Sequence, residues 1–164
     1  ATGRVPRCTS EPNPAVDSTA DVWAYVMAYI HPPPIPELNP PVGSGVTGLE
    51  TFLGVPIPPV HDGSLSAGVV SLEVHIEVDG VIVDWGDSTI DTYPASADAL
   101  SGFPDGIARH VYETKDPVGY PVLVAYDWTA RWRVAGGSWQ FLSIPNTSTG
   151  VDYQVAEIVS VLGN

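Results

Sequence analysis

Apolar and polar residues alternate without a break over residues 70–78, which is the pattern of a β-strand with one buried face. Asp79-Gly80 follows, and Asp-Gly is a favoured two-residue hairpin turn. Such a turn would place Val78 opposite Val81, so both strands would share one apolar face. The sequence therefore predicts a β-hairpin whose buried face contains Val70, Leu72, Val74, Ile76, Val78, Val81, Val83 and Trp85.

A second alternating run covers residues 120–134, and its even positions are all apolar. Gly136-Gly137 predicts a turn, after which residues 138–144 return as the next strand. The last β segment, residues 151–162, changes apolar phase near Ala156-Glu157, which indicates a bulge or bend. Several antiparallel strands with one apolar face each predict an all-β fold, an Ig-like antiparallel β-sandwich. The apolar positions of the second run are Val122, Val124, Tyr126, Trp128, Ala130, Trp132 and Val134.

Prolines divide the chain into two zones. Twelve of the seventeen lie in the first sixty residues, too many for a continuous sheet. We therefore expect an N-terminal Pro-rich arm over residues 1–60 and a β domain over residues 61–164.

The arm contains one expected helix, at about residues 18–30. Ser18 with Asp21 is typical of a helix start, and Pro32-Pro33-Pro34 would end the helix. The residues up to Pro41 should then be extended. The apolar stripe of this helix is expected to pack on something and is the candidate assembly interface; it consists of Val22, Trp23, Val26, Met27 and Ile30.

The charge of the chain is strongly one-sided, with nineteen acidic and six basic residues and a net charge of -13. Such a surface repels nucleic acid and disfavours anionic lipid. No run of eighteen apolar residues exists, so no membrane span is expected. Cys8 is the single cysteine, which excludes an intrachain disulfide and leaves a free thiol or a cross-link to another chain.

Three short segments follow one another in the order typical of a known family. They are Trp85-Gly86-Asp87-Ser88, His110-Val111-Tyr112 and Gly119-Tyr120-Pro121-Val122. In this order they resemble the PKD domains, Ig-like β-sandwiches found in many extracellular proteins. The resemblance implies structural roles for Trp85, Gly86, Asp87, His110, Tyr112, Gly119 and Tyr120, and it implies surface location and binding or assembly without a reaction.

A narrower likeness covers residues 36–164. The segments at residues 38–41, 48–53 and 155–158, taken with the Trp-Gly-Asp segment, resemble secreted actinobacterial PKD-like proteins with a Pro-rich N-terminal stretch. Three departures stand out. Ser88 replaces a glycine of the family turn, the loop 88–109 lacks a cysteine pair, and the Gly119-Tyr120 spacing is one residue shorter.

Metal binding is considered because the chain is acidic and calcium takes six to eight oxygen ligands. The turn and the Trp-Gly-Asp corner already explain two of the aspartates, so no cofactor is expected, and calcium is kept as the alternative. The weak calcium candidates are Asp79, Asp84, Asp87 and Asp91. The four histidines show no ligand spacing; His75 is expected at the surface between Glu73 and Glu77, and His110 is expected to be structural.

No nucleophile elbow and no Gly-rich phosphate loop is found, so the sequence predicts a protein that is not an enzyme. Trp128 and Trp132 are expected in the core, whereas Trp139 and Tyr153 are either core residues or a sugar-stacking or protein-binding surface.

The expected function is that of a non-catalytic, secreted or cell-surface structural or adhesive module. It would be a subunit of a surface or filamentous assembly through its N-terminal arm, with another copy of itself or another surface protein as partner. The alternative is a glycan- or calcium-binding accessory module.

Overall fold

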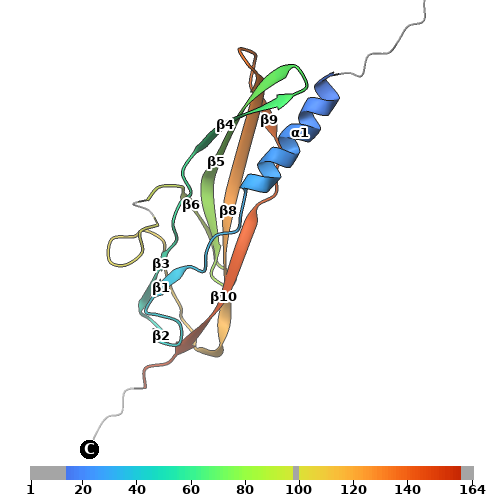
Figure 1. Ribbon diagram of the computed structural model, residues 1–164. Helices are drawn as coiled ribbons and strands as arrows, with labels where there is room; N and C mark the ends of the chain where they lie inside the picture. The colour runs from blue at the N-terminus through green and yellow to red at the C-terminus, as the bar shows by residue number, and fades with distance from the viewer. Residues whose placement is uncertain (1–13, 98–99, 160–164) are drawn as a thin grey trace, which may run out of the picture.

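The computed structural model describes residues 14–97 and 100–159, in which one helix precedes ten strands (Figure 1). The helix is α1 (Pro14–Tyr29). The strands are β1 (Glu37–Asn39), β2 (Gly45–Val46), β3 (Glu50–Gly54), β4 (His61–Ala67), β5 (Val70–Asp84), β6 (Ile90–Pro94), β7 (Arg109–Val111), β8 (Asp116–Val134), β9 (Gln140–Leu142) and β10 (Thr147–Ala156).

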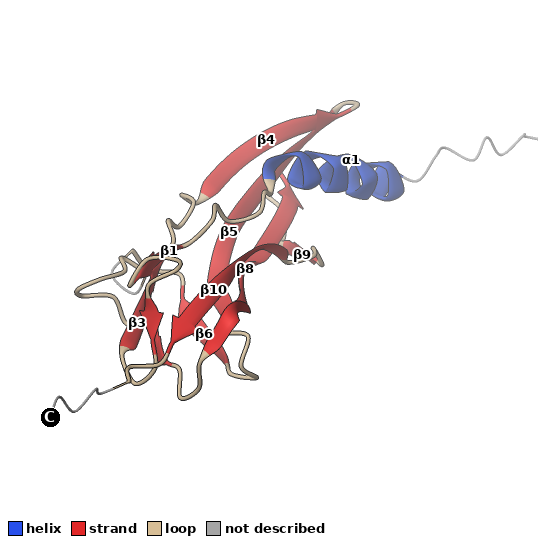
Figure 2. Ribbon diagram, turned by 90° about the horizontal axis from the view of Figure 1, so that it is seen from below, coloured by secondary structure: helices blue, strands red, loops and turns tan. Residues whose placement is uncertain are grey.

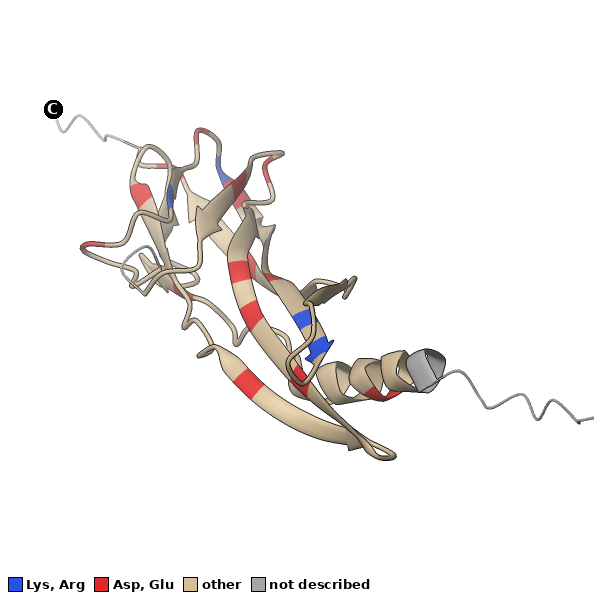
Figure 3. Cartoon of the chain, turned by 90° about the horizontal axis from the view of Figure 1, so that it is seen from above, with Lys and Arg blue, Asp and Glu red and all other residues tan. Residues whose placement is uncertain are grey.

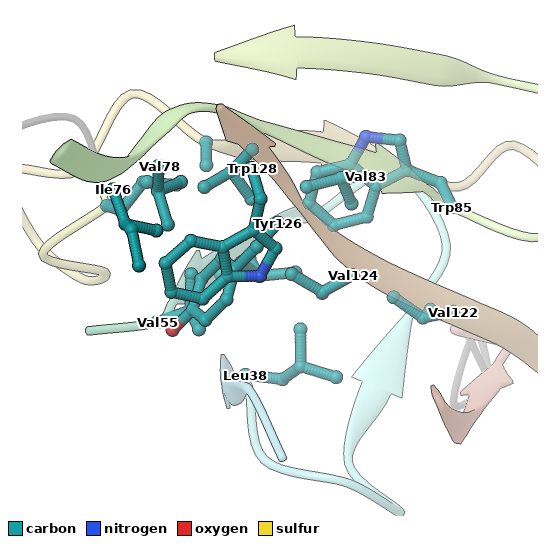
Figure 4. Packing of buried hydrophobic residues seen from close by; sticks show 14 of the residues in the cluster. Leu38, Val55, Ile76, Val78, Val83, Trp85, Val122, Val124, Tyr126 and Trp128 are labelled. Carbon is teal, nitrogen blue, oxygen red and sulfur yellow. The ribbon is translucent and has the colours of Figure 1, made fainter. Parts of the chain in front are cut away.

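The strands form two sheets, which confirms the predicted all-β class. The larger sheet has the order β2-β10-β8-β5-β4, with β6 also paired to β5 and β9 to β8, and it curls into a half-barrel (Figure 2). Its pairs are antiparallel except that of β10 with β2. The smaller sheet has the antiparallel order β1-β3-β7. One apolar cluster joins both sheets: Leu38 of β1 and Val55 after β3 lie near Tyr126 of β8 (Figure 4).

The predicted hairpin at Asp79-Gly80 is wrong, because β5 continues through it as one strand. Val78 pairs with Trp128 and Gly80 pairs with Asp127, so Asp79 is the extra residue of a β-bulge. A one-residue bulge shifts by one position the residues that face the core beyond it. A two-residue turn also leaves the residues on either side of it on one shared face, so both arrangements bury the same side chains. The predicted apolar face is therefore correct although the predicted turn is not. Its members from Leu72 to Trp85 are buried, and Val70 packs against them.

The remaining predicted strands are present, but the last one, β10, covers Thr147–Ala156 and not residues 151–162, of which those from 160 onward lie outside the described residues. The even positions of β8 from Val122 to Trp132 are buried, and Val134 at the strand end is 46% exposed. β9 returns along β8 after the Gly136-Gly137 turn. The irregularity in the last strand lies between Tyr153 and Val155, slightly before the expected position.

The helix begins at Pro14, four residues before the predicted start. Proline is well suited to the first helical position because the amide it lacks would have no partner there. Ser18 is therefore a buried residue inside the helix and not its cap. The helix packs on β4 and β5, where Gly63 makes room: a Cβ at Gly63 would overlap the Tyr25 hydroxyl.

The segment after α1 is extended, as predicted, and is tied to the sheet by hydroxyl groups. The Thr147 hydroxyl donates to the His31 carbonyl over 2.7 Å, and the Tyr153 hydroxyl donates to the Pro40 carbonyl over 2.9 Å. The Tyr126 hydroxyl donates to the Pro56 carbonyl. β1, β2, β3 and α1 all contribute to the sheets or to the common core.

Deleting Asp79 tests the bulge. Without it, the residues from Val81 to Trp85 would turn their apolar side chains to solvent, because a one-residue shift reverses the faces of a strand. We expect the deletion variant to lose cooperative thermal unfolding. Asp79→Asn, which keeps the bulge, should stay within about 0.5 kcal/mol of the wild type. A cooperatively folded deletion variant of normal stability would contradict the register.

Candidate functional site

The residues of the PKD-like pattern come together at the end of β5, in what we call the Trp85 cluster: Trp85, Gly86, Asp87, His110, Tyr112, Gly119 and Tyr120. Trp85 is fully buried. Gly86 has a φ of 83°, and a Cβ there would lie 2.8 Å from Pro121. The Asp84 carboxylate accepts a 2.9 Å hydrogen bond from the Gly86 amide. The corner thus requires glycine both for its backbone conformation and for space.

Asp87 and His110 form the charged part of the Trp85 cluster. His110 Nε2 lies 2.7 Å from Asp87 Oδ2, and the imidazole stacks on Trp85 with ring centroids 5.1 Å apart. The Thr89 amide donates to the other Asp87 oxygen over 3.1 Å. Burial tends to raise the pKa of Asp87, but the hydrogen bonds from His110 and Thr89 outweigh it and hold that pKa below its ordinary value.

The tyrosines complete the cluster on its buried side. The Tyr112 hydroxyl donates to the Trp85 carbonyl over 2.9 Å, and its ring stacks on Tyr120 at 4.5 Å. Burial, reinforced by the nearby Asp87 carboxylate, raises the pKa of Tyr112 far above its usual value, so the hydroxyl stays neutral. Gly119 has a φ of 117° and lies close to Asp152. The hydrogen bonds of these side chains run within the cluster and to its neighbours, which is the arrangement of a structural corner.

The weak calcium candidates are separated or already engaged. Asp79 lies in the β5 bulge, whereas Asp84 caps the corner and Asp87 is paired with His110. Asp91 accepts a 2.9 Å hydrogen bond from the Trp85 indole nitrogen. Within residues 14–97 and 100–159, no group of three or more His, Cys, Asp or Glu is arranged to hold a metal ion. Cys8 lies outside the described residues.

The structure divides the apolar stripe of α1. Val22 and Val26 are fully buried against the sheet, and Ile30 is partly buried beside them. Trp23 and Met27, one turn apart, remain 40% and 38% exposed. The part of the expected assembly interface that another molecule can reach therefore consists of Trp23 and Met27.

Of the expected surface aromatics, Tyr153 is buried in the core, and so are Trp128 and Trp132. Trp139 is partly exposed and lies over Arg131 and Arg133, whose guanidinium carbons are 5.0 and 4.5 Å from the indole ring. The alternation along β8 had placed both arginines on the polar face, but nothing in the sequence indicated that Trp139 would fold back over them.

The outer face also contains His75, which is bonded to a residue that the sequence did not suggest. Its Nδ1 lies 2.6 Å from Asp62 Oδ1 on β4, and its Nε2 lies 3.4 Å from Glu77. Glu73 instead pairs with Arg133, directly opposite it in the register of β5 and β8. Pairing of β4 with β5 brings Asp62 opposite His75, a contact between strands that local sequence does not show.

No family model matches this chain, and no match was found among curated proteins or solved structures. Within the described residues, no helix combines the length and the apolar character that crossing a bilayer requires.

Substitutions at Asp87 test its electrostatic role. A carboxylate with a lowered pKa stabilises the fold above its unfolded-state pKa, and this stability is lost as the pH falls through the folded-state value. We expect Asp87→Ala to lower the unfolding free energy at neutral pH by about 1–3 kcal/mol. Asp87→Asn should lose less stability than the wild type between about pH 5 and pH 3, measured by urea unfolding. Equal losses in both proteins would contradict the assignment.

Ser88 offers a test with the opposite sign. It has a φ of 78°, the left-handed conformation that a side chain disfavours. We expect Ser88→Gly to raise the unfolding free energy, by up to about 1 kcal/mol, because the steric cost disappears. Ser88→Ala keeps the Cβ and should leave stability almost unchanged. A less stable Ser88→Gly variant would refute this explanation.

Proposed function

We propose that this chain is a non-catalytic extracellular module with a PKD-like, Ig-like sandwich architecture, acting as a structural or adhesive subunit of a cell-surface or filamentous assembly. The observation that carries the proposal is the distribution of exposed apolar residues. The start of α1 and the end of β10 lie at opposite ends of an elongated domain (Figure 1). Large apolar side chains are exposed at both ends, and others, such as Phe141 and Ile90, are exposed elsewhere on the surface.

The end that carries α1 presents Trp23 and Met27, together with Val69 at the tip of the β4–β5 hairpin. The opposite end presents Val118 near the start of β8, and Ile158 and Val159 after β10, with exposures of 83%, 73% and 73%. Contacts between unlike ends of identical subunits are heterologous and extend into rings or filaments. Two different apolar ends therefore favour head-to-tail contact.

Charge also favours an apolar contact between copies. Acidic side chains are distributed over much of the molecule and basic ones are few (Figure 3). At a net charge of -13, two copies repel each other over distance. Association through Trp23 and Met27 would need little ionic pairing, and added salt would strengthen it by screening the repulsion.

Sedimentation velocity of the full chain over a range of concentrations and salt tests the proposal. We expect the average mass to rise with both, and the double substitution Trp23→Ser/Met27→Ser to reduce that rise strongly. Leu123→Ser is the matched control, because Leu123 is 42% exposed but lies in the middle of β8. Point substitutions are preferable to removing the N-terminal segment, because that deletion would also remove Val22 and Val26 from the core.

A wild-type chain that stays monomeric under all these conditions would refute self-assembly. A variant that associates like the wild type would place the contact elsewhere than on α1, which also contradicts the proposal.

A further inference from the structure

A groove of about 420 Å³ lies on the outer face of the larger sheet, on the side away from the core. Its walls come from three adjoining strands and from the turn before β9: Asp62 and Ser64 of β4, Glu73 of β5, Arg133 of β8, and Trp139. The volume falls toward the lower end of the range of small-molecule sites. It is separate from the Trp85 cluster, and none of its residues belongs to that cluster.

Trp139 forms an aromatic wall of this groove. Arg131 and Arg133 project from the same face of β8, two residues apart, and both guanidinium groups lie against the indole ring. The ring therefore contacts the sheet through the two arginines, and Trp139 as a whole remains partly exposed. In the described part of the chain, Nε of Arg131 is the one buried side-chain polar atom without a hydrogen bond, and the guanidinium carbon lies 5.0 Å from the indole ring.

The polar wall is held in place by one ion pair and one hydrogen bond. Arg133 Nε donates to Glu73, its cross-strand partner, and Asp62 is bound to His75 at 2.6 Å. The side chain of Asp62 is nevertheless 76% exposed and that of Glu73 is 40% exposed. Each carboxylate has further lone pairs that can accept hydrogen bonds. The groove thus offers fixed acceptors, a guanidinium and the Ser64 hydroxyl beside one aromatic ring.

Charge balance indicates the kind of ligand. The groove is lined by two carboxylates, of Asp62 and Glu73, and by the guanidinium of Arg133, and it is flanked by Arg131 and Glu77, so charges of both signs are mixed and nearly balanced here. A neutral ligand with an apolar face and many hydroxyl groups matches both walls: the apolar face covers the indole, and the hydroxyls bond the carboxylates and the guanidinium. We infer that this groove binds a neutral saccharide.

Isothermal titration calorimetry of the full chain with neutral gluco-, xylo-, manno- and chito-oligosaccharides tests the inference. We expect saturable binding of at least one of them. Trp139→Ala should weaken it roughly tenfold or more, through loss of the stacking surface. Trp139→Phe should retain part of the affinity, and Glu73→Gln should weaken binding by loosening the polar wall.

Trp23→Ala is the matched control, because it removes an exposed tryptophan on α1 and should leave saccharide affinity unchanged. It also separates this site from self-assembly, which that substitution weakens. If the Trp139→Ala variant does not fold, the saccharide affinities of Trp139→Phe and Glu73→Gln test the inference in its place. The inference is overturned if the wild type binds no oligosaccharide of the panel, if the Trp139 and Glu73 variants bind as well as the wild type, or if the groove binds a lysine-rich peptide instead.

Discussion

The long antiparallel pairing of β5 with β8 is the constraint on which the rest of this molecule depends. Each other strand of the larger sheet except β2 pairs with one of these two, and β2 joins through β10. The inner faces of both strands supply much of the core, from Leu72 to Trp85 and from Val122 to Trp132. The single extra residue at Asp79 keeps both halves of β5 in phase with β8. A slip of one position would expose half of that core to water.

This pairing also determines which side chains remain available to bind a ligand or a partner. The Trp85 cluster lies where β5 ends, and its polar groups are used to hold the corner: Asp84 and Asp87 bind backbone amides, and Tyr112 binds the Trp85 carbonyl. A buried polar group left without a partner would be costly, so such a network stabilises one backbone path. Residues whose polar groups already hold the corner in this way are poor candidates for ligand binding.

The accessible side chains that could bind a partner or ligand lie away from this corner, on opposite sides of the larger sheet. On one side, α1 buries Val22 and Val26 and leaves Trp23 and Met27 outside. On the other, Trp139 folds back over Arg131 and Arg133 and closes a groove against β4 and β5. The first surface is apolar and suits another protein copy, while the second mixes an aromatic ring with balanced charges and suits a small polar ligand. The two can act independently because the sheet separates them.

The sequence by itself determined the strand faces, the buried role of Trp85, Trp128 and Trp132, and the presence of a helix followed by an extended Pro-rich segment. These features follow from the periodicity of apolar residues and from the restricted backbone of proline. Both depend only on residues that are close together in the sequence. Only the tertiary structure decided that Asp79 forms a bulge, that Tyr153 is buried, that Val22 and Trp23 belong to different surfaces, and that Asp62 meets His75. A bulge and a tight turn leave the same alternation, so the choice between them depends on which distant strand pairs with β5. The groove could not be predicted from the sequence for the same reason, because its walls come from strands that lie far apart in the sequence and are brought together by strand pairing.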